Sequence, residues 1–147
     1  MSEEQQADDR VLVGVDGSPA SVEALREGAR VAGALGAPLE AAIVWSYPAA
    51  ELAVGAWDLD KSAASALDRA ILDAFGDRPP RIRRHVLAGP AAHTLIVESK
   101  RAGMLVLGGR GHGGFAGLLL GSVSAACAAH AHCPVLIVRP QPARTPG

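Results

Sequence analysis

Residues 105–122 read LVLGGRGHGGFAGLLLGS. The apolar residues 104–107 predict a short buried strand, and seven glycines follow among residues 108–121 before Ser122 opens a small-residue segment that ends near Ala131. Glycine lets the backbone approach a ligand closely, and the first turn of a helix presents unpaired N–H groups and the positive end of its dipole. The stretch therefore predicts a strand, a phosphate-binding loop and a helix N-terminus in succession.

Two common phosphate-binding motifs do not describe this loop. No Lys-Ser or Lys-Thr pair follows the glycines, so the loop is not of the Walker type. Gly109, Gly111 and Gly114 satisfy the G-x-G-x-x-G pattern, but a dinucleotide site of that kind needs an acidic residue about 20 positions further on. The sequence has no Asp or Glu after Glu98. A flexible glycine-rich connection without a ligand is the alternative interpretation.

Apolar patterning on both sides of the loop predicts one α/β domain. Strands are expected at 11–15, 39–45, 81–87, 104–107 and 134–138, with helices at 19–35, 60–75, 89–101 and 122–131. Such alternation is typical of an open, mostly parallel five-stranded sheet with helices on both faces. Ser18 is the expected N-cap of the first helix, and the imperfect alternation of 81–87 suits an edge strand. Residues 49–59 are expected to be irregular or partly helical, and residues 1–10 and 141–147 to be disordered tails around a domain at 11–140.

Composition and charge limit the classes of partner. No apolar run approaches the ~20 residues needed to span a bilayer, so we expect a cytoplasmic protein with no membrane partner. The formal net charge of −1 gives no general attraction to nucleic acid, and no nucleic-acid partner is expected. Cys127 and Cys133 match no standard metal-ligand spacing and are expected to be reduced thiols. The final third of the chain is locally basic, which suits an anionic small ligand.

Gly108, Gly111 and Gly121 form the pattern G-x2-G-x9-G-S within VLGGRGHGGFAGLLLGSVSAACAAHAHCPVLIVRP. This pattern resembles the C-terminal signature of the universal stress protein family, in its ATP-binding branch. VLVGVDGSPAS, AAIVWSYP and AGPAAHTLIVESKRAGMLVLG resemble the family's earlier blocks, so the resemblance extends from about residue 11 to residue 140. It implies a Rossmann-like fold, similar to the adenine nucleotide alpha hydrolases, with strand order 3-2-1-4-5. Three positions depart from residues common in the family: Ile43 replaces His, Met104 replaces Asp and Gly109 replaces Ser.

The resemblance also implies a nucleotide site where the ends of the first and fourth strands lie side by side. There the Asp16 carboxylate would accept hydrogen bonds from ribose or adenine, and the Val44 backbone would meet the adenine edge. Backbone N–H groups of the loop and helix start would hold ribose and phosphates. The expected site residues are Gly14, Val15, Asp16, Val44, Leu107, Gly108, Arg110, Gly111, His112, Gly121, Ser122, Val123 and Ser124.

Several of these residues have simpler structural interpretations. Asp16 suits an Asx turn before the first helix, Val44 suits plain strand core, and Ser122 suits an N-cap. Arg110 and His112 are adjustable cations near the phosphates or solvated loop residues. No catalytic residue and no metal ligand is expected, because no activated nucleophile or acid–base set can be assembled from the sequence.

The resemblance finally implies a regulatory protein of the stress response that holds ATP, with or without Mg²⁺. Turnover would be at most slow hydrolysis or autophosphorylation, and cyclic AMP is the alternative ligand. PVLIV at 134–138 would form a flat apolar edge strand, and the resemblance implies a homodimer through residues 135–138. The rival hypothesis is a homodimeric interaction module with a vestigial nucleotide site. The sequence identifies no regulatory protein partner.

Overall fold

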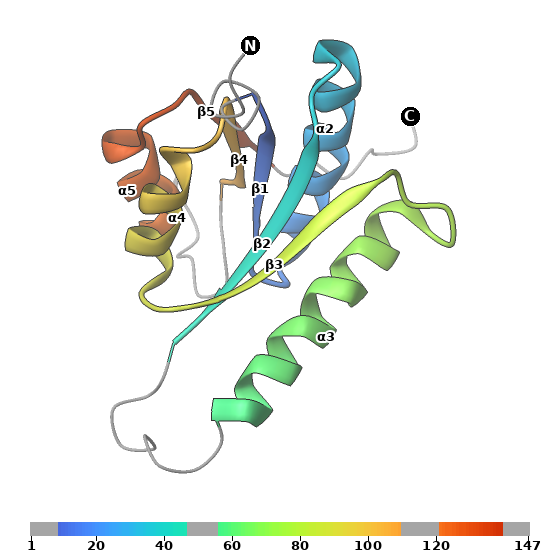
Figure 1. The fold of residues 1–147 in the computed structure, drawn as a ribbon, viewed down its shortest axis with the longest axis vertical. Helices are drawn as coiled ribbons and strands as arrows, with labels where there is room; N and C mark the ends of the chain where they lie inside the picture. Colours follow the sequence, from blue (N-terminus) through green and yellow to red (C-terminus); the bar gives the residue numbers. More distant parts are fainter. Residues whose placement is uncertain (1–8, 47–55, 110–120, 140–147) are drawn as a thin grey trace, which may run out of the picture.

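The computed structural model describes residues 9–46, 56–109 and 121–139, which form a five-stranded sheet with helices on both faces (Figure 1). The strand order is β3-β2-β1-β4-β5, and all four neighbouring pairs are parallel. The strands are β1 (Val11–Val15), β2 (Leu39–Trp45), β3 (Ile82–Ala88), β4 (Met104–Gly108) and β5 (Val135–Val138). The predicted fold class and strand order are confirmed.

Two helices cover each face of the sheet. Figure 1 shows α2 and α3 on one side, and α4 and α5 on the other. Their bounds are α2 (Pro19–Leu35), α3 (Ala56–Phe75), α4 (Ala91–Ser99) and α5 (Ser122–His130). The sheet therefore separates two apolar layers. Val13, Leu25 and Leu67 belong to the layer under α2 and α3, whereas Leu12 and Leu95 belong to the layer under α4 and α5.

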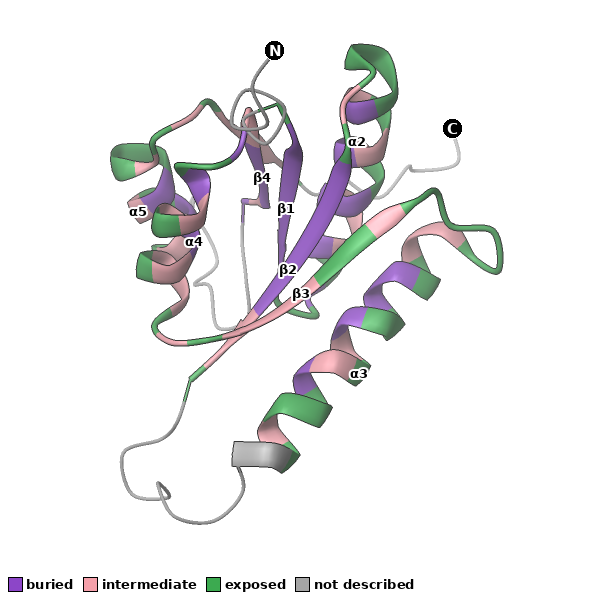
Figure 2. Ribbon diagram, viewed as in Figure 1, coloured by how far each residue is buried: buried purple, intermediate pink, exposed green. Residues whose placement is uncertain are grey.

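β1 is the central strand, and its sequence explains its position. All five of its residues are buried, as expected for a parallel strand covered on both faces. Val11 aligns with Leu39 of β2 on one side and with Met104 of β4 on the other. Figure 2 shows the contrast with the edge strand β3, whose residues are exposed or intermediate. The edge position predicted for this strand is confirmed.

Local capping signals fix α2. Ser18 is the N-cap, and its Oγ accepts a hydrogen bond from the Ser21 N–H at 3.2 Å. Gly36 ends the helix in the left-handed conformation, with φ of 65°, which glycine adopts without steric cost. Leu35 continues the apolar spacing of the helix but is 64% exposed, since the buried face ends at Ala32.

The other three helices differ from the predicted ones at their ends. α3 begins at Ala56 rather than residue 60, and residues 47–55 lie outside the described part of the chain. α5 ends at His130 rather than residue 131, and α4 runs from Ala91 to Ser99 rather than over 89–101. The chain then turns into β4, where the Gly103 N–H donates to the Arg10 carbonyl at 2.8 Å.

A buried ionic cluster joins the amino ends of three strands to α4. Arg10, which the sequence placed in the tail, is 8% exposed, and Glu40 of β2 is 5% exposed. Arg10 Nη1 donates to Glu40 Oε1 at 2.9 Å, and Arg10 Nη2 lies 3.5 Å from Glu98 Oε2. His85 of β3 contacts the same Glu40 oxygen. Glu40 therefore holds a buried guanidinium that has little access to water.

The two cysteines are free thiols, as expected. Cys127 is completely buried in the layer under α4 and α5, and Cys133 packs against that layer. Burial raises the pKa of both thiols, and their mutual proximity adds to the shift of the Cys127 pKa. In the described part of the chain, no helix has the length and apolar character that a membrane crossing requires.

The carboxyl end of β4 packs directly on the first turn of α2. A Cβ built on Gly108 would lie 2.7 Å from the Ala20 Cβ and 2.8 Å from the Ala20 carbonyl carbon. Real Cβ atoms do not approach other atoms this closely, and the backbone of a helix cannot turn aside as a flexible side chain can. Glycine at 108 is therefore required by packing, apart from any contact with a ligand.

We expect Glu40→Gln to lower the free energy of unfolding by about 3 kcal/mol, because it leaves the buried Arg10 with only the more distant Glu98 carboxylate, at 3.5 Å, to balance its charge. Urea denaturation followed by circular dichroism measures the loss. The control is Glu27→Gln, which breaks the Glu27–Arg30 pair on the surface of α2 and should cost much less. Equal losses in the two variants would contradict the importance of the buried cluster.

We expect Gly108→Ala to lower the free energy of unfolding by about 2 kcal/mol, because the added methyl group overpacks the contact with Ala20. Gly33→Ala is the matched control, since a Cβ at Gly33 of α2 meets nothing within 4 Å. That change should raise the free energy of unfolding by about 0.5 kcal/mol through helix propensity. Losses of the same size in both variants would show that the close packing at Gly108 is unimportant.

Candidate functional site

The order of the strands reverses between β1 and β4. The chain leaves β1 through α2 to reach β2, and it leaves β4 through α5 to reach β5 on the other side. Because α2 and α5 cover opposite faces, the connections that leave the carboxyl ends of β1 and β4 run to opposite sides of the sheet. Ligands of open α/β sheets bind outside the carboxyl ends of the strands at such a reversal. This edge is therefore the candidate site.

The two residues that flank the undescribed part of the glycine loop, Gly109 and Gly121, lie next to each other. The Gly121 N–H donates to the Gly109 carbonyl at 2.7 Å, and the Gly109 N–H donates to the Val138 carbonyl of β5 at 2.9 Å. Gly121 is the N-cap of α5 in an extended conformation, with φ of −74°. The start of α5 is thus held beside the end of β4, and the Gly121 N–H is already occupied.

Two serines at the start of α5 have different positions. Ser122 is the first helical residue rather than the N-cap, and it is exposed. Ser124 is buried, and its hydroxyl donates to the Gly108 carbonyl at 2.6 Å. Ser124 therefore fastens the helix to β4, whereas the Ser122 hydroxyl faces the solvent side. The sequence could not separate the two, because both lie within one helical turn.

The first turn of α5 presents backbone donors at the candidate site. The first helical hydrogen bond of α5 joins the Ala125 N–H to the Gly121 carbonyl at 2.9 Å. The N–H groups of Ser122, Val123 and Ser124 precede that bond, so the helix does not use them. No acidic residue lies in the first turn of α2, α4 or α5. An anion near the start of α5 would meet the positive end of that helix dipole, whereas the Asp16 carboxylate lies before the start of α2.

Asp16 lies at the carboxyl end of β1 and forms the turn predicted as its structural interpretation. Its Oδ1 accepts the Ser18 N–H at 2.9 Å, which is an Asx turn. The residue is exposed, and Gly17 follows with φ of 83°. Asp16 therefore sets the entry into α2 from the same edge where a ligand contact was expected.

The other expected residues on the strands form the packed base of this edge. A Cβ on Gly14 would lie 2.5 Å from Leu107 Cδ2 and 3.2 Å from Leu95 Cδ1, so β1, β4 and α4 pack closely here. Val15 is buried, whereas Val44 is intermediate and packs against the layer under α4 and α5. Arg110, Gly111 and His112 lie outside the described residues.

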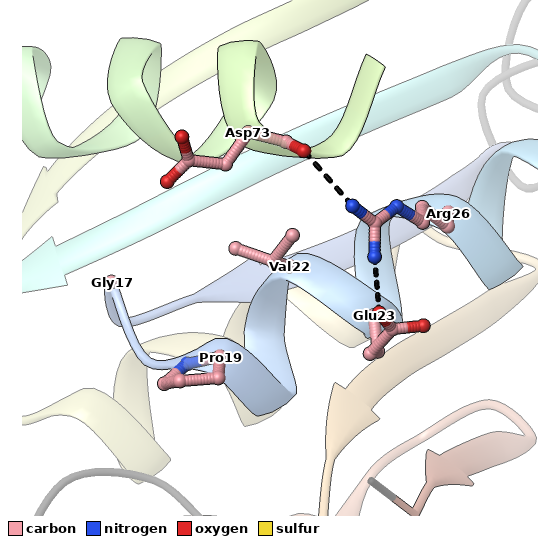
Figure 3. A pocket seen from close by; sticks show the side chains of 6 residues that line it. All are labelled: Gly17, Pro19, Val22, Glu23, Arg26 and Asp73. Carbon is pink, nitrogen blue, oxygen red and sulfur yellow. Dashed lines mark hydrogen bonds and ion pairs between the residues drawn. The ribbon is translucent and has the colours of Figure 1, made fainter. Parts of the chain in front are cut away.

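A shallow pocket of about 300 Å³ lies between α2 and α3 and extends to Gly17, in the turn that follows β1 (Figure 3). Arg26 crosses it and donates to two carbonyls in the last turn of α3, that of Asp73 at 2.9 Å and that of Ala74 at 3.1 Å. Its guanidinium also pairs with Glu23. These bonds tie α2 to the C-terminal end of α3, so the donors of Arg26 serve packing between helices. The pocket is lined by Gly17, Pro19, Val22, Glu23, Arg26 and Asp73.

Known proteins resemble this chain in sequence and in fold. A universal stress protein of Mycolicibacterium smegmatis is 37% identical over 134 residues, covering 89% of this chain and 46% of the relative. A universal stress protein of Mycobacterium tuberculosis is 34% identical over 167 residues, covering 97% of this chain and 52% of the relative. The chain thus spans about half the length of these curated relatives.

Solved structures agree with the sequence relatives. Universal stress protein UspA from Lactobacillus plantarum has a TM-score of 0.75 at 26% identity, covering 89% of this chain and 97% of that chain. A universal stress protein solved in complex with cAMP has a TM-score of 0.67 at 29% identity, covering 90% of this chain and 97% of that chain. Residues 9–139 match the sequence pattern of the universal stress protein family. This chain therefore belongs to the universal stress protein family.

Proposed function

We propose that this chain binds an adenine nucleotide at the carboxyl ends of β1 and β4 and acts as a regulatory stress protein without efficient nucleotide turnover. The observation that carries the proposal is the start of α5, where three backbone N–H groups precede the first helical bond beside the end of β4. Phosphate groups are the ligands that such a helix start attracts most strongly. The relative solved with cAMP supports an adenine nucleotide as the ligand.

ATP is the first candidate, because the glycine pattern resembles the ATP-binding branch of the family, and cyclic AMP is the second. Mg²⁺ would accompany ATP as the counter-ion of its phosphates. In this arrangement the first turn of α5 holds the phosphates, and the end of β1 with Asp16 faces the nucleoside. Arg110, Gly111 and His112 of the loop would complete the phosphate contacts.

We also propose that the chain forms a homodimer through β5. β5 is the edge strand next to β4, and its four residues, VLIV, are all apolar and only partly buried. An apolar edge strand with unpaired backbone groups favours pairing with another strand. The matching strand of a second copy would supply the missing hydrogen bonds and cover the apolar side chains.

Ser122→Asp tests the nucleotide site. The aspartate carboxylate would repel the phosphates, so the affinity for ATP should fall at least about ten-fold, or about 1.4 kcal/mol. The thermal midpoint of the empty protein should not fall, since an acidic residue in the first turn favours the helix dipole. Titration calorimetry with ATP and with cyclic AMP, after mass spectrometry of any nucleotide released on denaturation, measures both effects.

The matched control for this test is Ser65→Asp, which adds the same charge at an exposed position of α3 and should leave nucleotide affinity unchanged. If both substitutions weakened ATP binding equally, the loss would be explained by the change in net charge and not by a phosphate site at the start of α5. A parent protein that carries no nucleotide and binds neither ATP nor cyclic AMP would overturn the proposal in favour of the interaction module.

Hydrogen exchange tests the dimer without any substitution. Amide exchange in residues 135–138 should slow as protein concentration rises, because a second copy protects the outer edge of β5. Exchange in residues 82–88 of the opposite edge strand should not depend on concentration. A monomeric mass at all concentrations in sedimentation equilibrium, with unchanged exchange at β5, would exclude the dimer.

A further inference from the structure

The second edge of the sheet is β3, and its chemistry differs from that of β5. β3 pairs with β2 through seven aligned residues, and the strand order leaves its other side open in the described part of the chain. It has no proline and no break in register, so its outer backbone groups form a continuous row. An open edge of this length is a ready template for another strand.

Arginines crowd this edge. Four of the seven residues 78–84 are arginines, namely Arg78, Arg81, Arg83 and Arg84, and all four are exposed. Arg84 lies 3.3 Å from Asp68 of α3, and both side chains are exposed. Among the described residues, no ion pair engages the other three. The edge therefore carries positive charge that the fold itself does not neutralise.

The register places this charge on both sides of the strand. Arg83 aligns with Glu40 and therefore faces the side of α4, whereas Arg84 aligns with Ala41 and faces the side of α3. A strand added beside β3 would lie in the plane of the sheet, with Arg83 on one face and Arg84 on the other. Acidic residues on such a strand would meet an arginine on either face, as opposite charges do in cross-strand pairs.

A second copy of this chain does not fit this edge. Pairing β3 with another β3 would bring the uncompensated arginines of two copies together along one edge, where like charges are destabilising. Pairing β3 with the apolar β5 would leave the arginines without partners. The two edges of the sheet thus select different strands, and the β3 edge selects an acidic one.

We propose that the β3 edge binds an extended acidic segment of a partner protein, which adds to the sheet as a sixth strand. Main-chain hydrogen bonds to β3 would give the segment its extended form, and Arg81 and Arg83 would select its acidic side chains. This surface is separate from the nucleotide edge, so the proposal stands or fails independently of nucleotide binding.

The test uses a fluorescent ten-residue peptide of alternating glutamate and valine, with fluorescence anisotropy as the readout. The parent protein should bind this peptide, with affinity that falls as salt rises, and should not bind the same peptide with lysine in place of glutamate. The double variant Arg81→Glu and Arg83→Glu should weaken binding at least about ten-fold. The control replaces Arg101 and Arg139, two exposed arginines that lie before β4 and after β5, with glutamate and should keep the affinity.

Two backbone-methylated peptides separate strand addition from charge attraction. Successive N–H groups of a strand point to opposite edges, and an added strand uses only those that point toward β3. One peptide is methylated at the odd-numbered amides and the other at the even-numbered amides, so one of the two should lose binding and the other should keep it. Equal binding of both methylated peptides would show attraction without strand addition and overturn the proposal. Absence of binding by the parent protein would also overturn the proposal and would leave protection against aggregation as the role of the arginines. Equally tight binding of a single-stranded oligonucleotide would overturn it too, and would indicate a general surface for polyanions.

Discussion

Gly108 touches the backbone of Ala20 where β4 ends and α2 begins, and the geometry of the candidate site depends on this contact. A Cβ there would lie 2.8 Å from the Ala20 carbonyl carbon. The carbonyl of the same residue accepts the Ser124 hydroxyl from the other face of the sheet. One glycine therefore sets the first turns of α2 and α5 relative to the strand that lies between them. A side chain at this position would push the first turn of α2 away from the end of β4.

Much of the fold could be predicted because its signals are local. The apolar run of β1, the Ser18 and Pro19 start of α2 and the Gly36 stop each act within a few residues. The strand order came from the resemblance of the glycine pattern to a family, since apolar periodicity carries no information on which strands are neighbours. The start of α3 was missed because residues 56–59 have no clear helical periodicity of their own.

Contacts between distant segments, at either end of the sheet, could not be predicted in the same way. Arg10 and His85 come from distant segments of the chain, and both contact the same carboxylate oxygen of Glu40. They meet there because β3 and β2 pair in a particular register. A glutamate inside an apolar strand was the available signal, and it indicated a buried charge without naming its partner. Similarly, sequence could not distinguish Ser124, which bonds to Gly108, from Ser122, which is exposed.

The hydrogen bond between the Gly121 N–H and the Gly109 carbonyl has a consequence for how the chain can vary. The bond joins the two residues that flank positions 110–120, with 2.7 Å between the Gly121 nitrogen and the Gly109 oxygen. Doubling the length of such a stretch costs only about 0.6 kcal/mol in closure entropy. Because Gly109 and Gly121 close the framework by their own contact, a change of length between them would leave β4 and the start of α5 in the same relative position.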